Sequence, residues 1–364
     1  VDPDKLPIPH YGLWPFDEAV EQAWCEPHVP IDAGRGCPFT CTFCSTSRFF
    51  GQRFRMNSPS RIVREMKQLY DDYGITSFGL ASDTFTTSRQ VVKKVCHAMA
   101  HSGIPAIRWR CSARLDTVDR GLLETMRDSG CIGMVMGAET GTPRMQRVIR
   151  KNLDLRKVGP LVEDCLALDL DLDISMIVGF PEESWLDVGT TVDVVLRLGG
   201  MEKVYPQLYM LSPQPGTPIT EKHGRQLRFD GYYLDWSNSS RWLPRQEQRF
   251  VKEHPELCPE FYFIPNQRVS RRELKQVTDF TSLLLNTIPG LATFLRRVCD
   301  NPLAVLRRWS AAAAQAGLAI PSGCRFFRMK TSRERCGYLE VLLELLESDY
   351  CSADREVAFL TYFR

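Results

Sequence analysis

The stretch GRGCPFTCTFC, residues 34–44, carries three cysteines in a C-x3-C-x2-C pattern on a loop that glycines open. These cysteines are Cys37, Cys41 and Cys44. The apolar run at 29–33 just before the loop reads as a strand. The loop therefore lies at the carboxyl end of a strand, where α/β folds place their active sites.

A cubic iron–sulfur cluster normally takes four thiolates, so three ligands would leave one iron open to a substrate or cofactor. A structural zinc site needs a fourth Cys or His close by. The nearest histidine is His28, on the far side of the strand. The alternatives are three unrelated buried thiols, or a zinc site that a distant residue completes. The spacing, the glycines and the position together favour the open cluster.

From residue 28 to residue 213, short apolar runs with β-branched residues alternate with amphipathic stretches. Five helices with 3.6-residue apolar spacing separate the runs, and Ser58 with Pro59 opens the first of them. This alternation predicts an α/β fold with a parallel sheet and right-handed crossovers. Six units are too few for a closed eight-stranded barrel, so we expect a partial (β/α)6 barrel. The expected strands are 29–33, 77–81, 106–112, 133–137, 172–178 and 205–211.

The rest of the chain divides around this barrel. We expect an N-terminal lead-in at 1–27 with a short helix near 17–24, the barrel at 28–220, and a mainly helical C-terminal region at 221–364. That last region would cap the open end of the barrel over the substrate. Within it the sequence predicts aromatic-rich loop at 219–270, helices at 271–318 and 338–348, and a terminal strand at 356–363.

The composition is that of an ordinary globular protein, with 43% hydrophobic and 25% charged residues in 364. A formal net charge of +2 gives no reason to expect nucleic acid as a partner. The 13 cysteines are an odd number without regular spacing, and the start does not look like a signal peptide. No apolar run reaches membrane-spanning length. These features predict a reducing, cytoplasmic setting with no membrane contact.

The cysteine loop resembles the signature of the radical S-adenosylmethionine superfamily, including Phe43 just before the third cysteine. The resemblance implies a [4Fe–4S] cluster on Cys37, Cys41 and Cys44, whose open iron binds S-adenosylmethionine. One electron from the cluster then cleaves the sulfonium to a 5′-deoxyadenosyl radical, which abstracts hydrogen from the substrate. An external electron donor of the flavodoxin or ferredoxin type is therefore expected.

Two acidic elements follow in the order that the family shows. ASDTFT at 81–86 resembles the second-strand motif, which implies that Asp83 contacts the methionine amino group. GAETG at 137–141 resembles a G-x-E-x-G element, which implies that Glu139 lies near the methionyl or ribose end. An acidic residue at a strand end is often only a helix N-cap, and Asp83 allows that reading as well.

Two further stretches resemble the adenine side of the cofactor site. SMIVGFPEE at 175–183 implies roles for Ile177 and Gly179, and SPQPGTP at 212–218 implies one for Ser212. A glycine-rich strand end is more often just a tight turn. The order of these motifs behind the cysteine loop carries the resemblance, which spans residues 28–220.

Arg110 and Arg114 share one face of the strand predicted at 106–112 and its continuation. An arginine at a strand end can hold the cofactor carboxylate by a bidentate fork. The alternative is a salt bridge to one of three acids, Asp83, Asp116 or Glu139.

Several sequence segments resemble those of the cobalamin-associated branch of the superfamily: RWRCSARLD at 108–116, SGC at 129–131 and MIVGFP at 176–181. The opening KLPIPHY, 5–11, is similar to the linker after that branch's cobalamin domain. These 364 residues contain no such α/β domain and no D-x-H-x-x-G element. Either that domain was cut away, or this is a descendant that works without it.

The sequence thus predicts radical chemistry at an unactivated carbon of a small metabolite or peptide. The reaction would be methylation if cobalamin is supplied, and otherwise rearrangement, epimerisation, dehydrogenation or crosslinking. The alternative is a non-catalytic iron–sulfur or zinc scaffold or redox sensor. A second cluster is not expected. Four cysteines fall on core faces (Cys96, Cys111, Cys131, Cys165) and five are widely separated (Cys258, Cys299, Cys324, Cys336, Cys351).

Overall fold

The computed structural model describes residues 3–13, 28–234, 240–287, 295, 302–317 and 340–341. Several predictions lie outside these residues and remain predictions. They are the lead-in helix at 17–24, most of the helix at 338–348, the terminal strand at 356–363, and Cys299, Cys324, Cys336 and Cys351.

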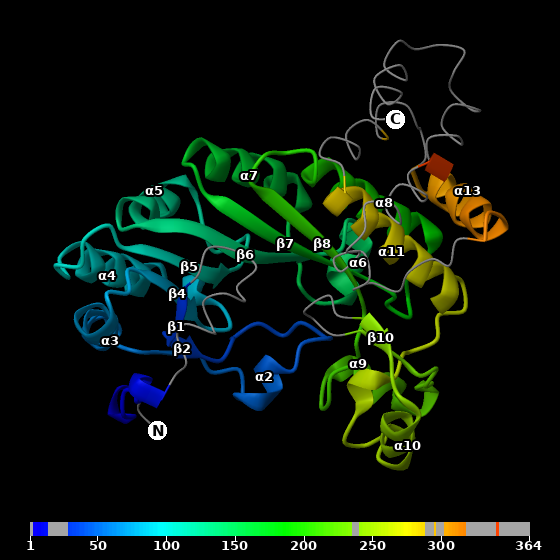
Figure 1. The fold of residues 1–364 in the computed structure, drawn as a ribbon, viewed down its shortest axis with the longest axis horizontal. Helices are drawn as coiled ribbons and strands as arrows, with labels where there is room; N and C mark the ends of the chain where they lie inside the picture. Colours follow the sequence, from blue (N-terminus) through cyan, green and yellow to red (C-terminus); the bar gives the residue numbers. More distant parts are fainter. Residues whose placement is uncertain are drawn as a thin grey trace, which may run out of the picture. The chain divides into compact units, whose positions relative to one another are not determined.

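Six strands form one sheet in the order β1-β4-β5-β6-β7-β8 (Figure 1). The pairings of β1 with β4, β4 with β5 and β5 with β6 are parallel. β1 and β8 are the two edges and do not pair, so the sheet is open, as expected for a partial barrel. All six predicted strands are confirmed. They are β1 (Val29–Asp32), β4 (Ser77–Ala81), β5 (Arg108–Ala113), β6 (Cys131–Glu139), β7 (Asp171–Val178) and β8 (Val204–Met210).

The five predicted crossover helices are also confirmed, and three of them (α3, α5 and α8) begin with a side-chain N-cap. The Ser58 hydroxyl accepts from Arg61 N, with Pro59 in the first turn. Asp119 accepts from Leu122 N in the same way. The helices are α3 (Pro59–Tyr73), α4 (Arg89–Ala100), α5 (Arg120–Asp128), α7 (Val158–Ala167) and α8 (Trp185–Leu198).

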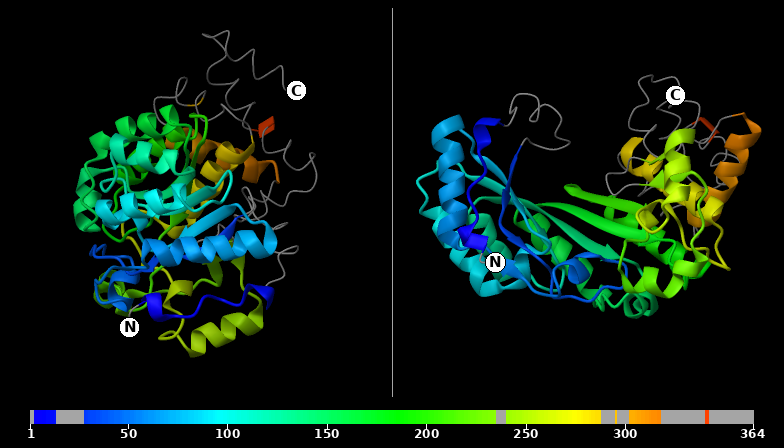
Figure 2. Two further views of the ribbon diagram at one scale, coloured as in Figure 1. Left: turned by 90° about the vertical axis from the view of Figure 1, so that its left-hand side faces the viewer. Right: turned by 90° about the horizontal axis from the view of Figure 1, so that it is seen from below.

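The strands bury one face and leave the other partly open. In β5 the buried positions are Trp109, Cys111 and Ala113, whereas Arg110 and Ser112 between them are partly exposed. Figure 2 shows α3, α4 and α5 on one side of β1, β4 and β5, which is the side that holds the core. The alternation of period two thus sends polar side chains to the uncovered face.

The chain forms two compact units. One comprises Val1–Ala138, Ile149–Ser175 and Lys203–Tyr205, and the other comprises Glu139–Val148, Met176–Glu202 and Pro206–Arg364. The boundaries expected at 27/28 and 220/221 remain predictions.

The region after β8 is richer in regular structure than the sequence indicated. The stretch predicted as loop at 219–270 contains a two-stranded hairpin and two α-helices, so that prediction was wrong in part. The helix α10 buries only Val251, which leaves almost no apolar period to detect. No helix in the described part is long and apolar enough to span a membrane. The elements are α9 (Pro218–His223), β9 (Tyr232–Leu234), β10 (Ser240–Trp242), α10 (Arg245–Glu253), α11 (Arg271–Thr287) and α13 (Pro302–Gln315).

Candidate active site on the cysteine loop and the strand ends

The three cysteines lie together on the loop that follows β1 and the short strand β2 (Gly34–Arg35). All three thiols are free and partly buried. Cys44 N donates to Cys41 O at 3.4 Å, which begins a turn, and Thr42 N donates to Ile149 O at 2.9 Å. The loop is therefore fixed to the backbone of its own unit.

Gly36, just before the first cysteine, sits where only glycine fits. Its φ of +89° is in the left-handed region. A Cβ built there would lie 1.9 Å from the backbone oxygen of Arg53. The glycine thus lets the segment around Arg53 pack directly against the start of the cysteine loop.

Asp83 ties the two ends of the cysteine loop together. Its Oδ2 accepts from Gly36 N at 2.6 Å, and its Oδ1 accepts from the Thr46 hydroxyl at 3.1 Å. Next to it, the Thr84 hydroxyl lies 3.6 Å from the Cys37 sulfur. The sequence reasoning placed Asp83 near the cofactor, and the structure places it at the cysteine loop. Its contact with the methionine amino group remains a prediction.

Arg114 reaches the same loop from the end of β5. Its Nη1 lies 3.7 Å from the Cys41 sulfur, and its guanidinium stacks 3.9 Å from the centre of the Phe39 ring. The Nε donates to Asp116 Oδ1 at 2.6 Å, so the alternative of a salt bridge to Asp116 is present, and a role of Arg114 toward the cofactor remains a prediction. Burial raises the pKa of the Cys41 thiol, and the charges of Lys151 and Arg114 oppose that rise.

Arg110 has a partner that the sequence reasoning missed. Its Nη2 donates to Asp173 Oδ2 on β7 at 2.9 Å, rather than to Asp83, Asp116 or Glu139. Gly133 makes room for this pair, because a Cβ there would come within 3.0 Å of Arg110 Nη2. The only sequence signal was the polar alternation of β7 at Asp171 and Asp173. A role of Arg110 toward the cofactor remains a prediction.

The other predicted cofactor residues belong to the second compact unit. Glu139 ends β6, is 7% exposed and has a φ of +68°. Ile177 occupies a half-buried position in β7. The Ser212 hydroxyl, after β8, donates to Glu260 O at 2.9 Å. Their contacts with a cofactor remain predictions.

The turn after β7 is closed by a carboxylate that the sequence reasoning did not single out. Glu183 is fully buried, and its Oε2 accepts from Gly179 N at 2.5 Å and Phe180 N at 3.0 Å. Burial raises the pKa of Glu183 to about 8, despite these two hydrogen bonds. The Asn266 side-chain amide donates to Phe180 O and Glu183 O, each at 2.9 Å. This turn is held from both sides.

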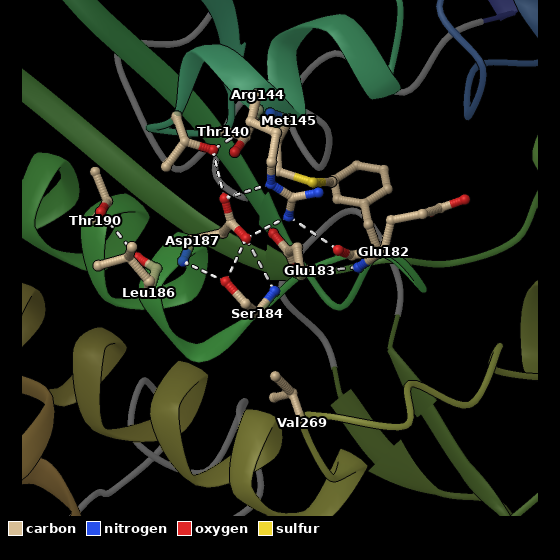
Figure 3. A network of polar contacts seen from close by, with 12 residues as sticks. Thr140, Arg144, Met145, Glu182, Glu183, Ser184, Leu186, Asp187, Thr190 and Val269 are labelled. Carbon is tan, nitrogen blue, oxygen red and sulfur yellow. Dashed lines mark hydrogen bonds and ion pairs between the residues drawn. The ribbon is translucent and has the colours of Figure 1, made fainter.

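A second carboxylate fixes the start of α8. Figure 3 shows the Asp187 carboxylate between Arg144 and Ser184, with both hydrogen-bonded to it. The Thr142 hydroxyl also donates to it, at 2.8 Å. Burial works against its charge, but the hydrogen bonds from Arg144 and Ser184 hold the pKa of Asp187 well below its ordinary value. Two buried carboxyl groups thus anchor the turn after β7 and the start of α8.

A cavity of about 80 Å³ adjoins the same turn. Gly179 at the end of β7 and Leu211 after β8 form one wall, and Asn266 and Leu274 line it as well. The cavity is mostly apolar, with Gly179 at its edge, which is suited to a flat ring.

The donor chemistry of the loop fits an iron–sulfur cluster. Three free thiols on one loop supply the ligands such a cluster takes, and Arg114 supplies a nearby positive charge. Among the described residues, no three His, Cys, Asp or Glu side chains already converge on one point.

Comparison with known proteins agrees with this site. Residues 31–195 match the sequence profile of the Radical SAM superfamily. The chain therefore carries a radical S-adenosylmethionine domain, and the resemblance of the cysteine loop is confirmed.

Several relatives are methyltransferases. An uncharacterized methyltransferase of Pyrococcus horikoshii is 31% identical over 60% of this chain and 46% of its own length. The cytidylyl-2-hydroxyethylphosphonate methyltransferase of Streptomyces wedmorensis is 29% identical over 49% of this chain and 35% of its own. The chain thus spans less than half the length of these two curated relatives.

Solved structures support the fold. The radical S-adenosylmethionine methyltransferase TsrM of Kitasatospora setae, with cobalamin and a [4Fe–4S] cluster bound, has a TM-score of 0.52 at 16% identity. The match covers 77% of this chain and 61% of that one. OxsB, a cobalamin-dependent radical enzyme with aqua-cobalamin bound, has a TM-score of 0.51 at 13% identity, over 92% of this chain and 57% of that one.

Proposed function

We propose that this chain cleaves S-adenosylmethionine reductively and abstracts hydrogen from an unactivated carbon of a small metabolite or peptide. The observation that carries the proposal is the cysteine loop itself. Its three free thiols lie beside Asp83 and Arg114, in a domain that matches the radical S-adenosylmethionine profile. The free thiols also suit a reducing cytoplasm.

In this proposal Cys37, Cys41 and Cys44 would hold the cluster, which when bound supplies the electron that breaks the sulfonium bond. The chain's own residues position the loop. Asp83 fixes its two ends, because it accepts from Gly36 N and Thr46. Arg114 keeps a positive charge beside the thiol of Cys41 and so offsets the negative charge that gathered thiolates carry.

The turn at Gly179 would orient the adenine end of the cofactor. Glu183 and Asn266 hold the backbone of this turn, and the adjoining cavity of about 80 Å³ is largely apolar. A rigid, preformed wall reduces the ordering that binding requires. We therefore assign these two side chains to orientation and not to a proton transfer.

Among the reactions open to such a radical, methyl transfer has the most support, because the two curated relatives reported above are methyltransferases. Cobalamin would then serve as the methyl carrier, as its presence in the two structural neighbours suggests. Rearrangement, epimerisation, dehydrogenation and crosslinking are the other outcomes of the same first step.

The test is an anaerobic assay of the reconstituted chain with S-adenosylmethionine and dithionite, in the presence and absence of cobalamin. We expect 5′-deoxyadenosine in both arms, read by mass spectrometry. S-adenosylhomocysteine formed only with cobalamin would support methyl transfer. Formation of neither product by a chain with an intact, reducible cluster would refute the proposal.

A further inference from the structure

A run of arginines surrounds the cysteine loop in the sequence. Residues 33–64 contain no Asp, Glu or Lys. The arginines in this run are Arg35, Arg48, Arg53, Arg55, Arg61 and Arg64. Arg61 is buried and donates to the backbone of Leu6 and Pro7, so it belongs to the packing of α3.

Four of the others lie on the short segments that flank the cysteine loop, together with an exposed aromatic ring. Arg35 in β2 lies directly opposite Arg55 in β3 (Arg55–Met56). Phe49, which ends α2 (Thr46–Phe49), is 81% exposed and packs edge-on against Phe50 at 4.8 Å. We call this the arginine surface, and its members are Arg35, Arg48, Phe49, Arg53 and Arg55.

The charges of this surface are poorly balanced within the described part of the chain. Like charges placed directly opposite each other on two strands are destabilising, as for Arg35 and Arg55. Arg35 has an acidic neighbour in Asp32, at 2.5 Å. The side chains of Arg53 and Arg55 make no hydrogen bond or ion pair with any described residue. Among the described residues this positive charge is therefore only partly balanced, which favours an acidic partner.

The surface is continuous with the cysteine loop. The backbone oxygen of Arg53 packs against Gly36, which precedes Cys37. At the other end, α2 begins two residues after Cys44. Whatever docks on the arginine surface therefore lies next to both ends of the loop that would hold the cluster.

We propose that the arginine surface docks an acidic one-electron donor protein of the flavodoxin or ferredoxin class. The inference rests on the proposed function, because reductive cleavage requires one external electron per turnover. On docking, the reduced donor loses one electron and the cluster gains one, with no bond formed or broken. Arginine and aromatic side chains are enriched at protein interfaces, and opposite charge accelerates encounter.

The experiment measures cluster reduction by stopped-flow absorbance under anaerobic conditions, with an acidic flavodoxin hydroquinone as donor. The variant is Arg53→Glu with Arg55→Glu, and Arg53→Gln with Arg55→Gln is a milder second variant. We expect the flavodoxin-driven rate to fall on the order of tenfold or more, and most at low salt. Dithionite, a small reductant, should reduce the variants within about twofold of the wild type, because its transfer needs no steered docking.

Arg249→Glu is the matched control, since that side chain is 81% exposed on α10, in the other compact unit. It should leave both rates unchanged. An equal loss with flavodoxin and dithionite would show that the arginines only support the loop, and would overturn the inference. So would unchanged flavodoxin rates, or tighter binding of single-stranded RNA than of flavodoxin. Failure of S-adenosylmethionine cleavage after normal reduction would instead count against the proposed function alone.

Discussion

Arg114 Nη1 lies 3.7 Å from the Cys41 sulfur, while the Nε of the same guanidinium donates to Asp116 at 2.6 Å. One cation thus connects a cluster-loop thiol to the end of β5. The side chain is only 7% exposed, so water screens this charge little. Arg114 is therefore a positioning residue, and we expect its loss to disturb the conformation of the cysteine loop directly.

Replacing Arg114 with methionine should lower iron loading of the chain several-fold and cost roughly 1–3 kcal/mol of unfolding free energy. The reason is that Asp116 and the Lys151 carbonyl lose their donor while the thiol loses its neighbouring charge. Iron per chain and urea unfolding report the two effects. Arg156→Met, at a 90% exposed site, is the control. Normal iron loading in Arg114→Met would contradict this assignment.

Replacing Gly36 with alanine should disrupt the cysteine loop more than the same substitution does at a left-handed glycine with open space around it. The new Cβ would meet Arg53 O at 1.9 Å, so the backbone must move. Gly74→Ala is the matched control, because its φ is +70° and nothing lies within 4 Å. The control should cost only about 1 kcal/mol and leave iron loading intact. Equal effects of the two substitutions would rule out the close approach as the cause.

The buried carboxyl group of Glu183 should make the stability of the folded chain depend on pH. Burial raises its pKa to about 8 in the folded chain, so the folded state holds a proton that the unfolded state releases near pH 4 to 5. The contribution of Glu183 to the free energy of unfolding is therefore present at low pH and is lost as the pH rises toward about 8.

Glu183→Gln should flatten this dependence and gain about 1 kcal/mol over the wild type at pH 8. Unfolding free energies measured from pH 5 to pH 8 test it. Glu253→Gln, at an exposed site, should keep the wild-type slope. Parallel curves for Glu183→Gln and wild type would show that burial does not hold the proton.

Asp187 should behave in the opposite sense. Its pKa is lowered in the folded chain, so its contribution is present above the ordinary carboxyl pKa and is lost as the pH falls below it. Asp187→Ala removes the acceptor of Arg144, Ser184 and Thr142 and should cost about 3 kcal/mol at neutral pH. Glu253→Ala breaks only an exposed pair with Arg249 and should cost less than about 0.5 kcal/mol. Similar losses would refute the role of the network.

The sequence was most informative where the spacing of apolar residues and the residues that begin helices indicated the same element. The alternation in β7 and the Ser58 cap of α3 are local signals, so the six strands and five crossover helices followed from them. The cysteine loop was found for the same reason, since its ligands lie within one short stretch. Features that depend on residues close together in the chain can be recognised from the sequence alone.

Long-range polar partners were not predictable in this way. Arg110 pairs with Asp173, which is 63 residues away, and Asn266 holds a turn that is 83 residues away at Glu183. Neither distance leaves a period or a motif in the sequence. α10 was missed for a different reason, because a surface helix with one buried residue resembles a loop.

The most direct test compares Cys44→Ser with Cys258→Ser, which removes a free, partly buried thiol elsewhere. Each reconstituted chain is incubated anaerobically with S-adenosylmethionine and dithionite, and 5′-deoxyadenosine is measured by mass spectrometry. The account predicts product from the wild type and from Cys258→Ser, and none from Cys44→Ser. Undiminished 5′-deoxyadenosine from Cys44→Ser, or none from a wild type with a reducible cluster, would contradict it.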